Sequence, residues 1–174
     1  MNYRKALDFI INEKQISISV LAKQLEVNKR WIEIILKNDE WNPCLKTILK
    51  ISDLTATDTA IFLRYAGDTF QGAIGNHTIY PEDISDTLRY YRFKKELSEN
   101  QLAQITGFQI SSISFRESNR YCNLPTLSTL ENYCKAYNIS IGEFINTATN
   151  INHQILHFNS MCRTLKLNRS LSLR

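Results

Sequence analysis

Apolar residues recur along most of the chain at the three- and four-residue spacings of amphipathic helices. The clearest stretch is residues 97–117, LSENQLAQITGFQISSISFRE. Within it, Ser98 stands three residues before Gln101, which is the pattern of a capping box at a helix start. Leu102 and Ile105 are expected to form the buried face of the short helix that follows.

A turn and a second helix follow in the same stretch. Gly107 is expected to end the first helix, because glycine readily adopts the left-handed backbone of a tight turn. A second short helix is expected at about 109–118, held to the core by Ile113. Two short helices joined by a tight turn form a helix-turn-helix.

The same pattern occurs a second time, near the start of the chain. Leu21-Ala22 align with Leu102-Ala103, and the PCLKTI segment at 43–48 aligns with the PTLSTL segment at 125–130 after a loop that is one residue longer in the second copy. Glu26 occupies the position of the turn glycine, which makes the first copy the more diverged one.

Each copy is expected to form five helices from its apolar periodicity, and the low content of 5 Gly and 3 Pro favours helices over many short strands. The expected helices are 3–14, 19–25, 28–37, 45–54 and 58–65, then 84–95, 99–106, 109–118, 127–137 and 140–147. Between the copies, residues 66–83 are expected to be a linker. Residues 149–174 form a basic tail that is expected to be helical or disordered and to offer a surface for a homodimer.

At these residues the chain resembles the helix-turn-helix family of lambda repressor and Cro. The resemblance is carried by Leu97, Ser98, Leu102, Ala103, Gly107, Phe108, Ser111, Ile113, Ser114 and Glu117, and then by the PTLSTL segment. It implies an all-α fold with two tandem five-helix repressor-like domains, at 1–65 and 84–148. It also implies sequence-specific binding of double-stranded DNA. A small helical bundle that uses the same turn without nucleic acid is the alternative.

The resemblance also implies which residues meet DNA. The base-reading positions of the second copy fall on Gln109, Ile110, Ser111, Ser112 and Phe115, and those of the first copy on Asn28, Lys29 and Arg30. Phosphate contacts fall on Lys37, Asn38, Asn119 and Arg120. In the first copy Glu26 and Glu33 also fit a simple solvated face, and Phe115 and Arg116 stand in exchanged positions relative to the family pattern, so that either could face DNA.

An ion pair between Arg92 and Glu117 is implied by the same resemblance and is expected to be structural. The corresponding residues of the first copy are Ile11 and Leu36, both apolar. Replacement of both partners together avoids leaving one buried charge uncompensated.

Composition adds the remaining expectations. The net charge is only +4, so DNA contact must come from local clusters, and the four cysteines lie far apart, as is typical of a cytoplasmic protein. No signal peptide or membrane span is recognisable, and no catalytic motif is present, so neither an enzyme nor a cofactor is expected. His153, His157 and Cys162 could in principle ligate a metal, but ordinary surface histidines are the favoured interpretation.

The resemblance to the helix-turn-helix family implies a transcriptional repressor, of a phage or mobile-element operon. One chain is expected to bind as a covalent pseudo-dimer on an asymmetric site, with the linker acting as a flexible tether. A DNA-processing accessory factor of a conjugative element is one alternative. A protein-binding module, such as an antitoxin or an anti-repressor partner, is another.

Overall fold

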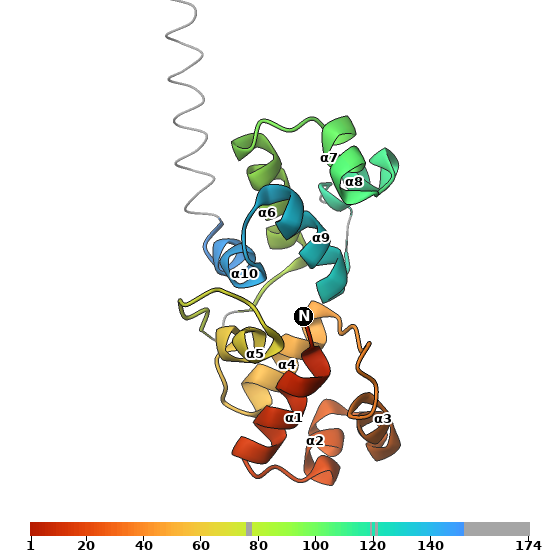
Figure 1. Ribbon diagram of the computed structural model, residues 1–174, viewed down its shortest axis with the longest axis vertical. Coiled ribbons are helices and arrows are strands. Elements are labelled where there is room, and N and C mark those ends of the chain that lie inside the picture. The colour runs from red at the N-terminus through yellow and green to blue at the C-terminus, as the bar shows by residue number, and fades with distance from the viewer. Residues whose placement is uncertain (76–77, 119, 121, 152–174) are drawn as a thin grey trace, which may run out of the picture.

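The protein is all-α in a computed structural model that describes residues 1–75, 78–118, 120 and 122–151 (Figure 1). Apart from one isolated antiparallel bridge, the regular structure of these residues is helical. The helices are α1 (Tyr3–Glu13), α2 (Ile18–Leu25), α3 (Lys29–Ile35), α4 (Leu45–Leu54), α5 (Thr59–Ala66), α6 (Pro81–Lys94), α7 (Glu99–Thr106), α8 (Ile110–Arg116), α9 (Leu127–Tyr137) and α10 (Ile141–Thr149). None of the described helices is long and apolar enough to cross a bilayer.

The helix boundaries repeat along the chain. The residue numbers at which α7 and α8 start and end differ from those of α2 and α3 by one constant amount. The starts of α9 and α10 differ from those of α4 and α5 by nearly the same amount, because the loop of the second copy is longer. Left-handed residues recur at matching places, as Gln15 and Glu96 do after the first helix of each set. The internal repeat in the sequence is therefore matched by a repeat in local structure.

Packing follows the repeat. In the first half of the molecule, residues 1–66, α1 lies against α5, and α2 lies against α3 and α4. In the second half, residues 81–151, α6 lies against α9 and α10, and α7 lies against α8 and α9. The buried apolar side chains of both halves belong to one continuous cluster, so neither half has a core that is closed off from the other.

The segment expected to be a linker is shorter than expected and partly buried. Ala66 belongs to α5, and residues 81–83 belong to α6, where the Asp83 carboxylate accepts a 2.8 Å hydrogen bond from the Tyr80 amide. Ile74 and Ile79 are buried in the shared core. Ile74 and Ile79 thus anchor the connecting residues 67–75 and 78–80 to the helices, while Thr69, Gln71 and Tyr80 remain exposed.

The connecting segment also touches α10. The Gly142 amide donates a 2.7 Å hydrogen bond to Asp68, and a Cβ atom placed at Gly142 would collide with the side chain of Phe70. Only a residue without a side chain fits at this contact between the connector and the second half.

Equivalent residues of the two halves meet at a short seam. Cys44 and Thr126, which precede α4 and α9, form the antiparallel bridge. The Leu45 amide donates to the Pro125 carbonyl at 2.8 Å, and the Leu127 amide donates to the Pro43 carbonyl at 2.9 Å. The two hydrogen bonds join the same repeat positions in reverse order. The backbone of residues 43–45 and 125–127 therefore has an approximate local twofold symmetry at the seam.

Contacts on either side extend this seam. The Asn42 side chain donates to the Ser128 hydroxyl at 2.7 Å and accepts from the Ser128 amide at 3.1 Å, and α5 lies against α10, its counterpart in the repeat. The chain's amino group lies 3.5 Å from the Glu131 carboxylate, which also accepts a hydrogen bond from the Tyr3 hydroxyl. Burial, reinforced by this carboxylate, raises the pKa of the Tyr3 phenol well above its usual range.

One expected core residue lies outside the core. Leu102 is fully buried, but Ile105 is 56% exposed, so the expectation that both line the buried face of α7 is wrong for Ile105. The inward face of this helix is formed by Leu102 with the half-buried Ala103 and Thr106, because α8 and α9 pack on that side only.

Candidate nucleic-acid interface

The second helix-turn-helix is closed by local hydrogen bonds. Ser98 and Gln101 form the expected reciprocal capping box, with the Ser98 amide donating to Gln101 at 2.8 Å. Gly107 ends α7 in the left-handed region, with φ of 72°. Phe108 then packs on the ring of Tyr133 in α9, with 5.3 Å between centroids. The turn therefore holds α8 in a defined orientation on the core.

One face of α8 lies in solvent. Ser111 and Phe115 are exposed there, as are Ile110 and the preceding Gln109, while Ser112 is half-buried. Gln109 is the N-cap residue, but its side chain makes no capping hydrogen bond. The positions that the family resemblance assigns to base contacts are thus exposed from the N-cap Gln109 to Phe115 in the last turn, except the half-buried Ser112.

Of Phe115 and Arg116, only Phe115 has an exposed side chain. Phe115 is 52% exposed, whereas the Arg116 guanidinium lies 5.0 Å above the ring of Phe108. Arg116 therefore packs over the turn by a cation–π contact and does not join the exposed face. Ser114 is tied to α7 through a hydrogen bond from its hydroxyl to Glu99, a contact that no sequence pattern indicated.

Arg92 and Glu117 form a buried ion pair. The Arg92 guanidinium donates to Glu117 from Nε at 2.8 Å and from Nη2 at 2.7 Å, and the two side chains are only 10% and 5% exposed. Nη1 of Arg92 also donates to the Leu97 carbonyl at 3.2 Å. The hydrogen bonds to Glu117 raise the pKa of Arg92 above its usual value. The pair connects the end of α6 to the residue that ends α8.

The first half has an apolar pair at the same place. Ile11 is buried, and Leu36, the residue that ends α3 as Glu117 ends α8, packs against the same core. The two positions that hold the Arg92–Glu117 pair in the second half are thus occupied by apolar residues in the first half.

The first helix-turn-helix keeps the left-handed turn without glycine. Glu26 has φ of 60° and ψ of 38°. Lys50 reaches this turn from α4, with its ammonium 3.3 Å from the Leu25 carbonyl and 3.7 Å from the Glu26 carboxylate. The turn is held from outside by a lysine that the sequence alone did not single out.

The outer surface of α3 is charged. Lys29 and Arg30 are exposed beside Trp31 and Ile34, and Lys29 forms a 3.6 Å ion pair with Glu33. Asn28 is engaged as the N-cap, because its side-chain oxygen accepts a 2.8 Å hydrogen bond from the Arg30 amide.

Of the four residues expected on phosphates, the three that the structure describes lie in the loops after α3 and α8. Lys37 and Asn38 are exposed after α3, and the Asn38 side chain accepts a 2.9 Å hydrogen bond from the Glu40 amide. Arg120 is exposed after α8, whereas Asn119 lies outside the described residues.

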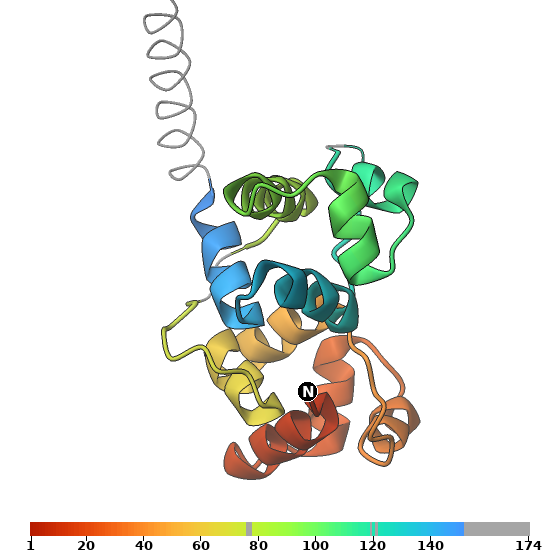
Figure 2. The same cartoon turned by 45° about the horizontal axis from the view of Figure 1, so that its top comes forward.

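Both candidate reading helices lie on the same side of the molecule. In Figure 1, α3 and α8 occupy the right-hand edge at opposite ends of the long axis, and Figure 2 keeps both on that edge after rotation. The twofold seam lies between them. The sequence-predicted residues of the two copies therefore form two separate patches on one side of the molecule.

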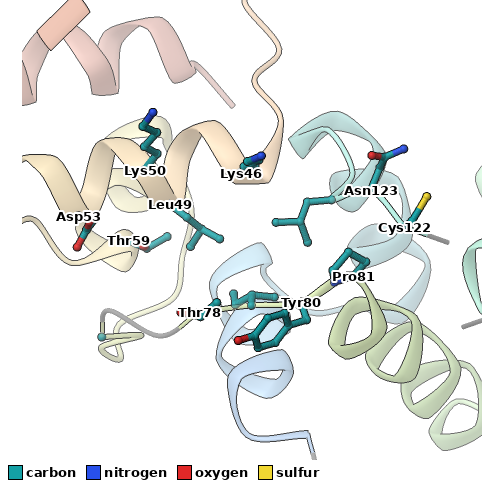
Figure 3. A pocket seen from close by; sticks show the side chains of 13 residues that line it. Lys46, Leu49, Lys50, Asp53, Thr59, Thr78, Tyr80, Pro81, Cys122 and Asn123 are labelled. Atoms are coloured by element: carbon teal, nitrogen blue, oxygen red, sulfur yellow. The ribbon is translucent and has the colours of Figure 1, made fainter. Parts of the chain in front are cut away.

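A pocket of about 630 Å³ opens where the two halves meet, as Figure 3 shows. Its walls come from α4, from the connector at 78–81 and from the loop at 122–124. Leu49, Ile79 and Leu124 supply apolar surface, while Lys46 and Lys50 project from α4. Sequence reasoning did not find this pocket, because its walls come from segments that are far apart in the chain.

No group of three metal-ligating side chains is found among the described residues, and His153, His157 and Cys162 lie outside them. Known proteins add no assignment: the chain matches no protein-family model, no curated protein and no solved structure.

Proposed function

We propose that this protein binds double-stranded DNA sequence-specifically through α3 and α8, with its two halves acting as tandem five-helix repressor-like domains. The observation that carries the proposal is the reciprocal seam, where equivalent residues of the two halves pair in reverse order, while α3 and α8 lie on one side of the molecule (Figure 1). Dimeric helix-turn-helix proteins use this arrangement to place two helices in successive major grooves, about 34 Å apart.

The seam supports binding of one chain to two half-sites in opposite orientation. Because the connector is packed, the spacing between the half-sites is set by the seam rather than by the reach of a flexible tether. The reading helices differ in sequence, KRWIEII against ISSISFR, so the two half-sites differ as well. The proposed target is therefore an asymmetric site: two unlike half-sites in opposite orientation at a fixed spacing.

Repression of transcription is the role that we propose for this binding. A protein held across successive major grooves can exclude RNA polymerase from an overlapping promoter. We place this role in the cytoplasm, on an operon of a phage or a mobile element. A DNA-processing accessory factor would use the same surface, and repression of a reporter by the selected site distinguishes the two roles.

A protein-binding module is the second candidate, and exposed apolar side chains favour it. Ile105, Ile110 and Phe115 are all exposed on α7 and α8. A partner protein could cover them, whereas in a major groove such side chains would contact thymine methyl groups. A stable complex with a co-encoded protein, without any mobility shift of DNA, would favour this candidate.

Selection of bound duplexes from a random library, followed by footprinting, tests the proposal. The double variant Ser111→Glu with Ser112→Glu is expected to lose at least tenfold in affinity for the selected duplex, because its carboxylates would face base edges and phosphates. Thr69→Glu with Gln71→Glu is the matched control, since it adds the same charge on the exposed connector. If the folded Ser111/Ser112 variant binds the selected duplex within threefold of wild type, α8 does not lie in the groove.

A further inference from the structure

The two reading helices present different chemistry to a ligand. Around α3, four basic side chains are exposed: Lys23, Lys29, Arg30 and Lys37. Lys46 adds a fifth exposed base beside Trp31, with which it shares a small surface pocket. Lys29 is paired with Glu33, and Glu26 and Glu40 are exposed in the same region, so Lys23, Arg30, Lys37 and Lys46 supply most of the surface that can neutralise phosphates.

The exposed face of α8 has no formal charge. Within α8, all of whose residues are described, the exposed side chains are those of Ile110, Ser111, Ser114 and Phe115. Arg116 is folded over Phe108, and the charge of Glu117 is paired with Arg92. Arg120, exposed after α8, can still meet a phosphate, but the helix surface itself offers only hydrogen bonds and apolar contacts.

Side chains that could hydrogen-bond to bases are more available on α8 than on α3. Gln109 precedes α8 with a side-chain amide that makes no capping bond, and a glutamine amide can bond adenine bidentately. The equivalent residue of the first half, Asn28, uses its side-chain oxygen to cap α3. Glu33, partly exposed on α3, would also face the negative potential of the groove.

We propose that the two halves divide the work of DNA binding: the first half supplies sequence-tolerant attraction to phosphates, and the second half supplies base discrimination. This inference rests on the proposed function and names the target more closely, as one specific half-site beside a second half-site whose sequence matters little. The seam makes the division effective, because the first half's affinity raises the local concentration of the second half's site.

Two double variants separate the two contributions. Lys29→Ala with Arg30→Ala should weaken binding to the selected duplex and to a scrambled duplex by the same factor. Each lost phosphate contact removes about 0.9 from the slope of log affinity against log salt concentration, so the slope should become shallower by about 1.8. Lys5→Ala with Lys135→Ala removes the same charge from exposed sites outside the reading helices and is the matched control.

Gln109→Ala with Ser111→Ala should give the opposite result. The preference for the selected over the scrambled duplex should fall at least tenfold, while the salt slope stays that of the wild type. Both residues are exposed and Gln109 makes no capping bond, so circular dichroism and the melting temperature should show a folded protein.

Loss of discrimination in the Lys29/Arg30 variant would overturn the inference, and so would unchanged discrimination in the Gln109/Ser111 variant. Half-site scrambling gives an independent check: changing the bases under the second half should weaken binding far more than changing those under the first. If the wild-type protein binds no duplex at all, the proposed function itself is wrong, which is a different outcome from either variant result.

Discussion

The buried pair of Arg92 and Glu117 is the residue-scale feature whose energetics can be tested most directly. Glu117→Ala is expected to lower the free energy of unfolding by about 3 kcal/mol, because it leaves the Arg92 charge buried with only the Leu97 carbonyl as an acceptor. The combined change Arg92→Ile with Glu117→Leu copies the apolar pair of the first half and should recover most of that loss. Urea denaturation of the three proteins measures both quantities.

The control for this cycle is the Lys29–Glu33 pair, which is exposed on α3. Glu33→Ala should change stability by less than about 0.5 kcal/mol, as is usual for a solvated pair on a helix. If the Arg92/Glu117 double variant were as unstable as Glu117→Ala alone, the two residues would not be coupled.

At the scale of single elements, the α2–α3 turn carries strain that its counterpart avoids. Glu26 and Gly107 end their helices in the same left-handed region, at φ of 60° and 72°. An L-residue in that conformation costs about 1–2 kcal/mol relative to its usual backbone. Glu26→Gly is therefore expected to raise the free energy of unfolding by about 1 kcal/mol, in spite of losing the exposed ion pair with Lys50.

Gln24→Gly and Gly107→Ala are the control variants for Glu26→Gly. Gln24 lies within α2 and is exposed, so glycine there should destabilise by up to about 1 kcal/mol. Gly107→Ala should also destabilise, through backbone strain alone, because nothing lies within 4 Å of the added Cβ. Equal destabilisation by Glu26→Gly and Gln24→Gly would show that the left-handed turn stores no strain.

At the scale of the whole molecule, the seam predicts a cross-link. The hydrogen bonds flank the Cys44–Thr126 bridge, which makes it a narrow antiparallel pair with Cα atoms about 4.5 Å apart. That separation suits a disulfide. Thr126→Cys is therefore expected to join Cys44 by an intrachain disulfide under mild oxidation, detectable by free-thiol titration and by faster migration on a non-reducing gel.

The cross-linked protein should bind the selected duplex as tightly as the reduced one, because the bond would lock the arrangement that binds. Adding Cys44→Ser removes the cross-link and controls for the loss of the Thr126 cap on α9. Failure to cross-link would show that the halves do not meet at the seam in solution. A cross-linked protein that no longer binds DNA would show that the halves rearrange on the duplex.

Most of the local structure could be predicted from the sequence, because it depends on neighbouring residues. The helices α4, α7 and α9 span the residues expected for them, and the Ser98 capping box is the one that its spacing indicated. The left-handed residue at the end of α7 follows from glycine itself. These features need only residues within one or two turns of each other, so periodicity and capping chemistry were sufficient.

The surface chemistry required the tertiary structure. Ile105 is exposed and Arg116 folds over Phe108, because the side on which α8 and α9 pack decides which way each face points. The connector is packed because its apolar residues meet a core that both halves share. The seam joins backbone groups that are distant in the sequence, and an extended backbone segment carries no sequence mark of the partner it will pair with. The sequence thus determined the helices and their repeat, whereas long-range packing decided how the two copies face each other and which side chains are exposed.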